Sequence, residues 1–186
     1  MPIENAPFSM QEYNRRIAKT RDAMARAGLD VLFVTDPSNQ AWLTGYDGWS
    51  FYVHQGVILG LEDDPVWWGR RQDTNGGVRT VWMSDDHVQG YADTYVQNPN
   101  AHPMEDLATR LRDLGHAKAR IGVEMDNYYY SAKANAVLTA ALPDAVAFQY
   151  GTLLVILLNT AGHLGYSHHL TGAGSNANGW SLLFGL

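Results

Sequence analysis

The sequence contains no cysteine, which excludes disulfide bonds and thiolate chemistry. This absence agrees with a reducing compartment without establishing one, because many exported proteins also lack cysteine. Charge is missing from the end of the chain, since all 32 Asp, Glu, Lys and Arg residues precede position 145. No Gly-rich phosphate loop, nucleophile elbow or His-Glu-x-x-His zinc motif occurs. The apolar run at 153–158 is far shorter than the roughly 20 residues that span a bilayer.

The remaining composition is that of one ordinary globular domain. A chain of 186 residues, 46% of them hydrophobic, can bury a core without disulfides. The net charge is −6 and the basic residues are scattered among acids, so nucleic acid is not an expected partner. The amino terminus has no basic segment followed by an apolar stretch, which favours a cytoplasmic location over secretion, and no membrane association is expected.

Alternating apolar patterns predict an α/β domain. Ser9 and Glu12 form a capping box that should begin a first helix, and Gly28 can end it. Further helices are predicted at 38–43, 74–83, 104–114 and 131–142. Strands are predicted at 31–35, 52–59, 66–69, 121–124 and 146–148, with a weaker one at 89–92. This order predicts a three-layer domain with a mixed β-sheet flanked by helices.

An aromatic cluster follows the first predicted strand and includes Trp49, Phe51 and Tyr52. Residues at the exit of a strand are held by the sheet yet can face a ligand. Ring faces attract cations, so this cluster predicts a pocket for a small delocalised cation, to which Trp67 and Trp68 could contribute. The alternative is that these aromatic residues simply pack the core. Trp49 is the residue least expected to pack in the core, because it follows an Asp-Gly turn.

A second candidate group comprises Arg70, Arg71 and Asp73, directly after the predicted strand 66–69. An arginine there could hold a substrate carboxylate through two parallel hydrogen bonds. Together with the aromatic cluster it would form a clamp for a zwitterion, with Arg71 and Asp73 as its polar members. The alternative is that Asp73 caps the following helix and that the arginines are solvated.

No residue is assigned a catalytic or metal-binding role. His54 falls inside the predicted strand 52–59 and is interpreted as a hydrogen-bonded core or interface histidine. His102 and the other histidines before position 120 are isolated, and those after it have no carboxylate or cysteine nearby to complete a metal site. Asp85 and Asp86 are interpreted as part of a turn, and the three tyrosines at 128–130, where the last helix opens, as packing residues.

Several motifs occur in order within residues 8–148. They read DPSN at 36–39, WLTGY at 42–46, WSFY at 49–52, WWGR at 67–70, MSDD at 83–86, HPM at 102–104 and IGVEMDNY at 121–128. This series resembles the amino-terminal domain of the creatinase/prolidase (pita-bread, peptidase M24) superfamily, and within it the ectoine hydrolases. The resemblance implies a ribonuclease H-like fold, a homodimer, and loops that contact a small zwitterion such as ectoine at the neighbouring subunit's active site.

The resemblance also implies a missing half. In the superfamily, a carboxy-terminal domain binds two divalent metals through two Asp, one His and two Glu, because cations that activate water need several carboxylates. We therefore divide the chain into a domain at 1–150 and an uncharged tail at 151–186 that departs from the family pattern. No cofactor is expected in this chain, and it should be inactive alone.

Two explanations of the tail remain open. One is a truncated or frame-shifted reading frame or a chimera, and the other is an uncharged extension that packs on the sheet or is disordered. The alternatives for function are the amino-terminal domain of an Xaa-Pro peptidase or creatinase relative, and a separate module that binds a small zwitterion or another protein.

Overall fold

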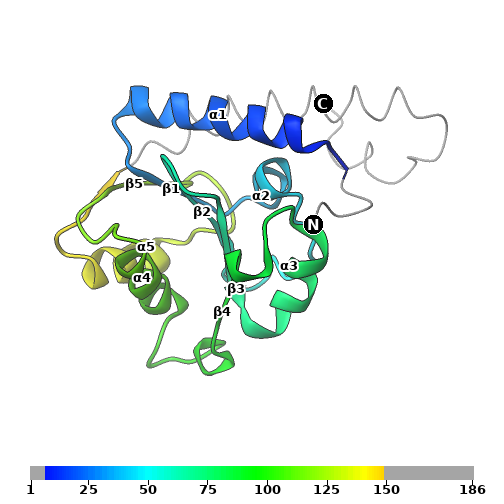
Figure 1. The fold of residues 1–186 in the computed structure, drawn as a ribbon. Coiled ribbons are helices and arrows are strands. Elements are labelled where there is room, and N and C mark those ends of the chain that lie inside the picture. The colour runs from blue at the N-terminus through cyan, green and yellow to red at the C-terminus, as the bar shows by residue number, and fades with distance from the viewer. Residues whose placement is uncertain (1–6, 149–186) are drawn as a thin grey trace.

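A mixed six-stranded sheet forms the centre of the computed structural model, which describes residues 7–148 (Figure 1). The strands are β1 (Val31–Val34), β2 (Gly56–Gly60), β3 (Val66–Arg70), β4 (Val88–Tyr91), β5 (Arg120–Val123) and β6 (Val146–Phe148). Their order across the sheet is β4-β3-β2-β1-β5-β6. β2 runs antiparallel to both of its neighbours, and the other three pairs are parallel. This confirms the predicted three-layer α/β class.

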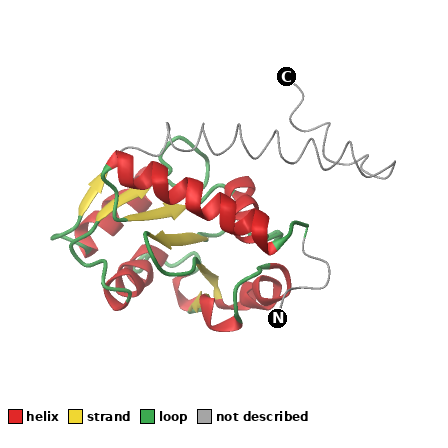
Figure 2. Ribbon diagram, turned by 45° about the horizontal axis from the view of Figure 1, so that its top comes forward, coloured by secondary structure: helices red, strands yellow, loops and turns green. Residues whose placement is uncertain are grey.

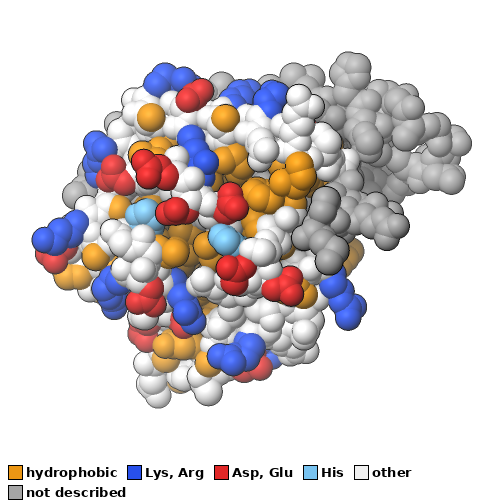
Figure 3. All heavy atoms as spheres, in the orientation of Figure 1, with side chains coloured by type: hydrophobic (Ala, Val, Ile, Leu, Met, Phe, Trp, Pro, Cys, Tyr) orange, Lys and Arg blue, Asp and Glu red, His pale blue; other side chains and the backbone are white. Residues whose placement is uncertain are grey.

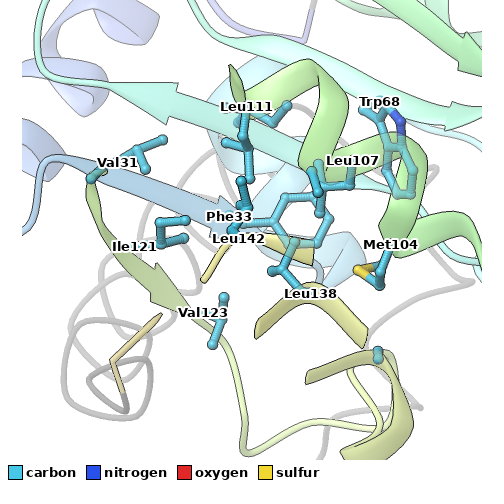
Figure 4. Packing of buried hydrophobic residues seen from close by; sticks show 14 of the residues in the cluster. Val31, Phe33, Trp68, Met104, Leu107, Leu111, Ile121, Val123, Leu138 and Leu142 are labelled. Carbon is cyan, nitrogen blue, oxygen red and sulfur yellow. The ribbon is translucent and has the colours of Figure 1, made fainter. Parts of the chain in front are cut away.

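Helices cover both faces of the sheet (Figure 2). One face carries α1 (Met10–Ala27), α2 (Pro37–Thr44) and α3 (Thr74–Thr80), and the other carries α4 (Pro103–Asp113) and α5 (Ala132–Ala141). Each helical layer packs against one face of the sheet and encloses a separate apolar core with it. Leu107 and Leu111 of α4 pack toward Phe33 of β1 in one core (Figure 4), while Ile17 and Met24 of α1 belong to the other.

Helix α1 starts and stops where the sequence predicts. The Ser9 hydroxyl accepts a hydrogen bond from the Glu12 amide at 3.3 Å, and Gly28 ends the helix with a φ of 69°, a left-handed conformation that favours glycine. Within the helix, Arg16 is fully buried. Its guanidinium lies 3.8 Å from the centre of the Phe8 ring and 5.3 Å from that of Trp42, and it donates to the Trp42 carbonyl. α1 is thereby fixed against α2.

Several predicted boundaries and roles are wrong. β2 begins at Gly56 and not at 52, because residues 51–53 form a turn, so His54 lies in a loop outside the strand. Of the three tyrosines interpreted as packing residues, Tyr130 is buried but Tyr128 is fully exposed. Trp67 and Trp68 are both 0% exposed, so neither can line an open pocket. The apolar run at 153–158 and the rest of the tail lie outside the described residues.

Candidate functional site

The predicted site residues gather at one edge of the sheet. Because β1, β3, β4 and β5 are parallel to one another and β2 opposes them, four carboxyl ends and the amino end of β2 share this edge. Ligands of open α/β sheets bind outside the carboxyl ends of the strands. The segments that meet there are residues 35–36, the loop 46–55, residues 71–73 and the turn 125–131.

The loop at residues 46–55, here called the aromatic loop, exposes its large rings. Trp49 is 73% exposed, Tyr52 72% and Phe51 39%. The centre of the Phe51 ring lies 6.0 Å from that of Trp49 and 6.5 Å from that of Tyr52, so the three rings form one group. The predicted exposure of Trp49 is confirmed. A cluster of exposed aromatic rings is typical of a binding surface.

A buried polar triangle holds the aromatic loop from beneath. The Tyr46 hydroxyl lies 2.9 Å from the Ser50 hydroxyl, and both bond to the Gln55 side-chain oxygen, at 3.1 and 2.7 Å. Burial raises the pKa of Tyr46 to about 12, so its hydroxyl stays protonated. A Cβ at Gly48 would lie 2.1 Å from the Tyr46 hydroxyl oxygen, so only glycine fits there. The triangle occupies the space beneath the loop.

Asp73 lies beside this triangle, whereas Arg71 projects into solvent. Burial raises the pKa of Asp73, while Arg70 and the neighbouring Ser50 hydroxyl act in the opposite direction. Asp73 makes no side-chain cap bond to α3, so the alternative interpretation of Asp73 as a helix cap is wrong. Arg70 is paired with Asp93 at 2.6 Å, but Arg71 is exposed and has no ion-pair partner among residues 7–148. Arg71 is therefore the arginine available to a ligand.

Glu124 is a central residue of this edge that the sequence analysis missed. It is 1% exposed, and its Oε2 accepts hydrogen bonds from the amides of Thr35 and Asp36, both at 2.6 Å, while Oε1 accepts from the Asn39 side chain at 2.7 Å. Burial raises the pKa of Glu124 to about 7, and these three donors oppose that shift. A signal was present, because an acidic residue directly ends the apolar predicted strand 121–124.

Asn127 connects Glu124 to the aromatic loop. Its side-chain NH₂ donates to the Thr35 hydroxyl at 3.0 Å, and its oxygen accepts from the amides of Tyr129 and Tyr130 at 2.8 and 3.1 Å. The Tyr129 ring then packs edge to face on Phe51, with ring centres 6.2 Å apart. The turn 125–131 and the aromatic loop thus form one continuous surface.

His54 and His102 lie together at the same edge, although the sequence suggested that His102 was isolated. Their ring centres are 4.8 Å apart, and His102 Nδ1 caps α4 by accepting from the Met104 amide at 3.2 Å. Burial lowers the pKa of His54 to about 4, so this ring is neutral at pH 7. No group of three or more His, Cys, Asp or Glu side chains within residues 7–148 is placed to hold a metal ion.

The other features of the described residues are a surface hollow, a mixed distribution of charge and helices that are short or polar. A hollow of about 400 Å³ lies away from this edge, between Ile17 and Arg21 of α1, Asp64 and Trp82. On the face shown in Figure 3, Lys and Arg side chains lie among Asp and Glu. This mixture differs from the clustered positive charge of a phosphate-binding surface. Within the described part of the chain, every helix is too short or too polar to cross a membrane.

Comparisons with known proteins point to one family. The sequence profile described as Creatinase/Prolidase N-terminal domain matches residues 16–155. The chain is 59% identical to the ectoine hydrolase of Halomonas elongata over 140 residues, which is 75% of this chain and 35% of that protein. It is 41% identical to an uncharacterized hydrolase/peptidase of Sinorhizobium fredii over 80% of this chain and 38% of that protein. The chain thus spans little more than a third of the length of these relatives.

Solved structures share the fold at low identity. A proline dipeptidase from Streptococcus pneumoniae superposes with a TM-score of 0.58 at 18% identity, covering 76% of this chain and 95% of that one. A Creatine_N superfamily domain of a dipeptidase from Streptococcus thermophilus gives a TM-score of 0.59 at 14% identity, covering 76% and 97%. At such identities the likeness concerns the fold alone.

Proposed function

This chain belongs to the creatinase/prolidase N-terminal domain family, and from that premise we propose that it is the non-catalytic, substrate-contacting domain of a C–N hydrolase similar to ectoine hydrolase. The relatives' activity would involve the part of their length that this chain does not match. A dinuclear divalent metal would belong to that part. The 186-residue chain alone should therefore bind no stoichiometric metal and turn over no ectoine.

The observation that carries the proposal is the exposed aromatic loop above its buried polar triangle. Trp49, Phe51 and Tyr52 present ring faces that attract a delocalised cation, and ectoine carries an amidinium ring. Arg71, exposed and without an ion-pair partner among the described residues, suits the ligand's carboxylate. Asp73 can accept hydrogen bonds from the cationic group. The five residues together would contact opposite ends of one small zwitterion.

We also propose that this surface faces a second subunit. Exposed aromatic residues in a fixed loop are typical of protein contacts, and covering them would remove apolar surface from water. In a homodimer, each aromatic loop would reach the reaction site of the partner subunit. The domain would then shape the pocket and exclude water without supplying a catalytic group. We expect this assembly to be cytoplasmic.

A chimera tests the substrate-contacting role directly. Residues 16–155 of this chain would replace the matching segment of the Halomonas elongata ectoine hydrolase. In an active chimera, Trp49→Ala and Arg71→Ala should each lower kcat/KM for ectoine by about tenfold or more, a loss of roughly 1.4 kcal/mol of transition-state binding. Leu61→Ala is the matched control, because Leu61 is 39% exposed but lies in the hairpin at the opposite edge. Unchanged kinetics in both site variants would refute the proposed contacts.

A second candidate function has its own support. The structural neighbours include a proline dipeptidase and other dipeptidase domains, so the same fold serves proteins that are named for peptide substrates. If the chain serves such an enzyme, the Arg71 side chain would hold the carboxylate of a dipeptide. Assays of the chimera with Xaa-Pro dipeptides beside ectoine separate the two. A separate binding module would instead bind ectoine as the isolated chain, which an NMR titration would detect.

A further inference from the structure

Three close hydrogen-bond donors, each within 2.7 Å, converge on the buried Glu124 carboxylate. Two are consecutive backbone amides, those of Thr35 and Asp36, where β1 ends and α2 begins, and the third is the Asn39 side chain in the first turn of α2. Both amides precede the first turn of α2, whose own free amides, those of Ser38 and Asn39, already bond to the Asp36 side chain. The junction between β1 and α2 thus forms a separate anion site, and the fold fills it with its own carboxylate from the residue after β5.

The site requires an acceptor and not merely a side chain of the right volume. A carboxylate presents two acceptor oxygens, whereas a glutamine would direct an NH₂ group at one of these donors. Burying a carboxylate is costly unless such bonds compensate for lost hydration. Among the described residues, the charged group that faces Glu124 is Asp36, which adds to the upward pKa shift caused by burial. Thr35, Asn39 and Asn127 are neutral.

The contacts extend from Glu124 to the aromatic loop in two steps. Asn127 approaches the Glu124 Oε2 at 3.4 Å and the Thr35 hydroxyl at 3.0 Å, which fixes its side chain. The Asn127 oxygen then holds the amides of Tyr129 and Tyr130. Tyr129 contacts Phe51 of the aromatic loop, whereas Tyr130 is buried with Phe33 in the core.

We propose that Glu124 is a positioning residue that, by occupying the anion site at the junction of β1 and α2, fixes the turn 125–131 and through Tyr129 the aromatic loop. The proposal rests on the proposed function, because it is the aromatic loop that gives the positioning its purpose. Glu124 itself lies beneath the surface and would touch no substrate. Its effect on binding would be indirect, through the placement of Phe51 and its neighbours.

NMR spectroscopy of the ligand-free 186-residue chain tests this without any assumption about substrate. In the wild-type protein, the amide proton shifts of Thr35 and Asp36 should titrate with a midpoint of about 7, the pKa to which burial raises Glu124. Glu124→Gln should abolish that titration. Glu105→Gln, an exposed glutamate of α4, should leave it unchanged. A merely space-filling Glu124 would give the same flat profile in all three proteins.

Amide hydrogen exchange then follows the coupling to the loop. In Glu124→Ala, exchange at Tyr129 and Tyr130 should accelerate about tenfold or more, and the resonances of residues 49–55 should shift, while the amides of α4 stay protected. Added formate should reverse both effects by entering the vacated anion site, whereas formamide should not. Accelerated exchange confined to Thr35 and Asp36 would overturn the proposal.

A second variant keeps the test decisive if Glu124→Ala fails to fold. Asn127→Ala leaves the three close donors to Glu124 in place, but it removes the 3.4 Å contact from Asn127 to Glu124 Oε2 and the acceptor for the Tyr129 and Tyr130 amides. The proposal requires shifts in the aromatic loop while the Asp36 amide still titrates. An unchanged loop would refute the positioning role, even if the chimera confirmed that Trp49 contacts substrate.

Discussion

Two pairs of aromatic residues, close in sequence, have opposite environments. Trp49 and Tyr52 are 73% and 72% exposed, whereas Trp67 and Trp68 are both completely buried. Consecutive residues of a strand point to opposite faces of the sheet, and here helices cover both faces. Trp67 therefore enters one core and Trp68 the other. The exposed pair belongs to a loop whose underside is already filled by polar groups.

Each tryptophan of the buried pair also has a hydrogen-bond acceptor for its indole N–H. The Trp67 indole donates to the Gln40 side-chain oxygen at 3.2 Å, and the Trp68 indole donates to Asp106 at 2.8 Å. A buried indole N–H without such an acceptor would be costly. The two pairs thus differ in whether helices and hydrogen-bond acceptors surround their side chains. Composition alone does not reveal this difference.

The largest expected effect comes from the buried side of this comparison. Trp68→Ala should lower the free energy of unfolding by about 3 to 5 kcal/mol, because it removes a large ring from a closed core and leaves Asp106 without its indole donor. Denaturant titration followed by circular dichroism measures this loss. Trp68→Phe should recover part of it. A loss below about 1 kcal/mol for Trp68→Ala would mean that the ring is not packed as described.

A smaller effect should come from the base of the aromatic loop. Tyr46→Phe removes the hydroxyl that bonds Ser50 and Gln55, at a cost of about 0.5 to 1.5 kcal/mol for a net hydrogen bond. The loop should also become more susceptible to cleavage by chymotrypsin near Phe51. Tyr128→Phe is the matched control, because Tyr128 is fully exposed. Equal cleavage of both variants would show that the polar triangle does not hold the loop.

The sequence predicted the strand and helix order well, because apolar periodicity and capping residues are local signals. Ser9 and Gly28 mark the ends of α1 without reference to the rest of the chain. Prediction from the sequence fails where the position of a residue depends on partners that are distant along the chain. The apolar residues after His54 predict a strand there, yet His54 contacts His102 in a loop. The importance of Glu124 depends on donors some 85 to 89 positions away.

A pH-dependent effect should arise at the partly exposed Glu12, which forms ion pairs with Arg15 and Arg16. The hydrogen bond from Arg15, together with Arg16, lowers the pKa of Glu12 from 4.5 to about 2. A carboxylate with a depressed pKa stabilises the fold above pH 4.5, and this contribution is lost as the pH falls toward 2. Glu12→Gln should therefore reduce stability by about 0.5 to 1 kcal/mol at pH 7, with little difference near pH 2. Thermal melts across this range would reveal it, with Glu105→Gln as the control.

The smallest effect on stability should come from the most exposed aromatic residue. Trp49 contacts Phe51, with ring centres 6.0 Å apart, and is otherwise directed to solvent, so Trp49→Ala should change the free energy of unfolding by less than about 1 kcal/mol. A tryptophan that costs so little to remove from the fold, yet whose removal impairs the chimera, would be retained for contact with substrate or partner. If Trp49→Ala instead destabilises the isolated chain by as much as Trp68→Ala, the contrast between the two pairs fails. The aromatic loop would then be a packing element, and its proposed role in binding would lose its support.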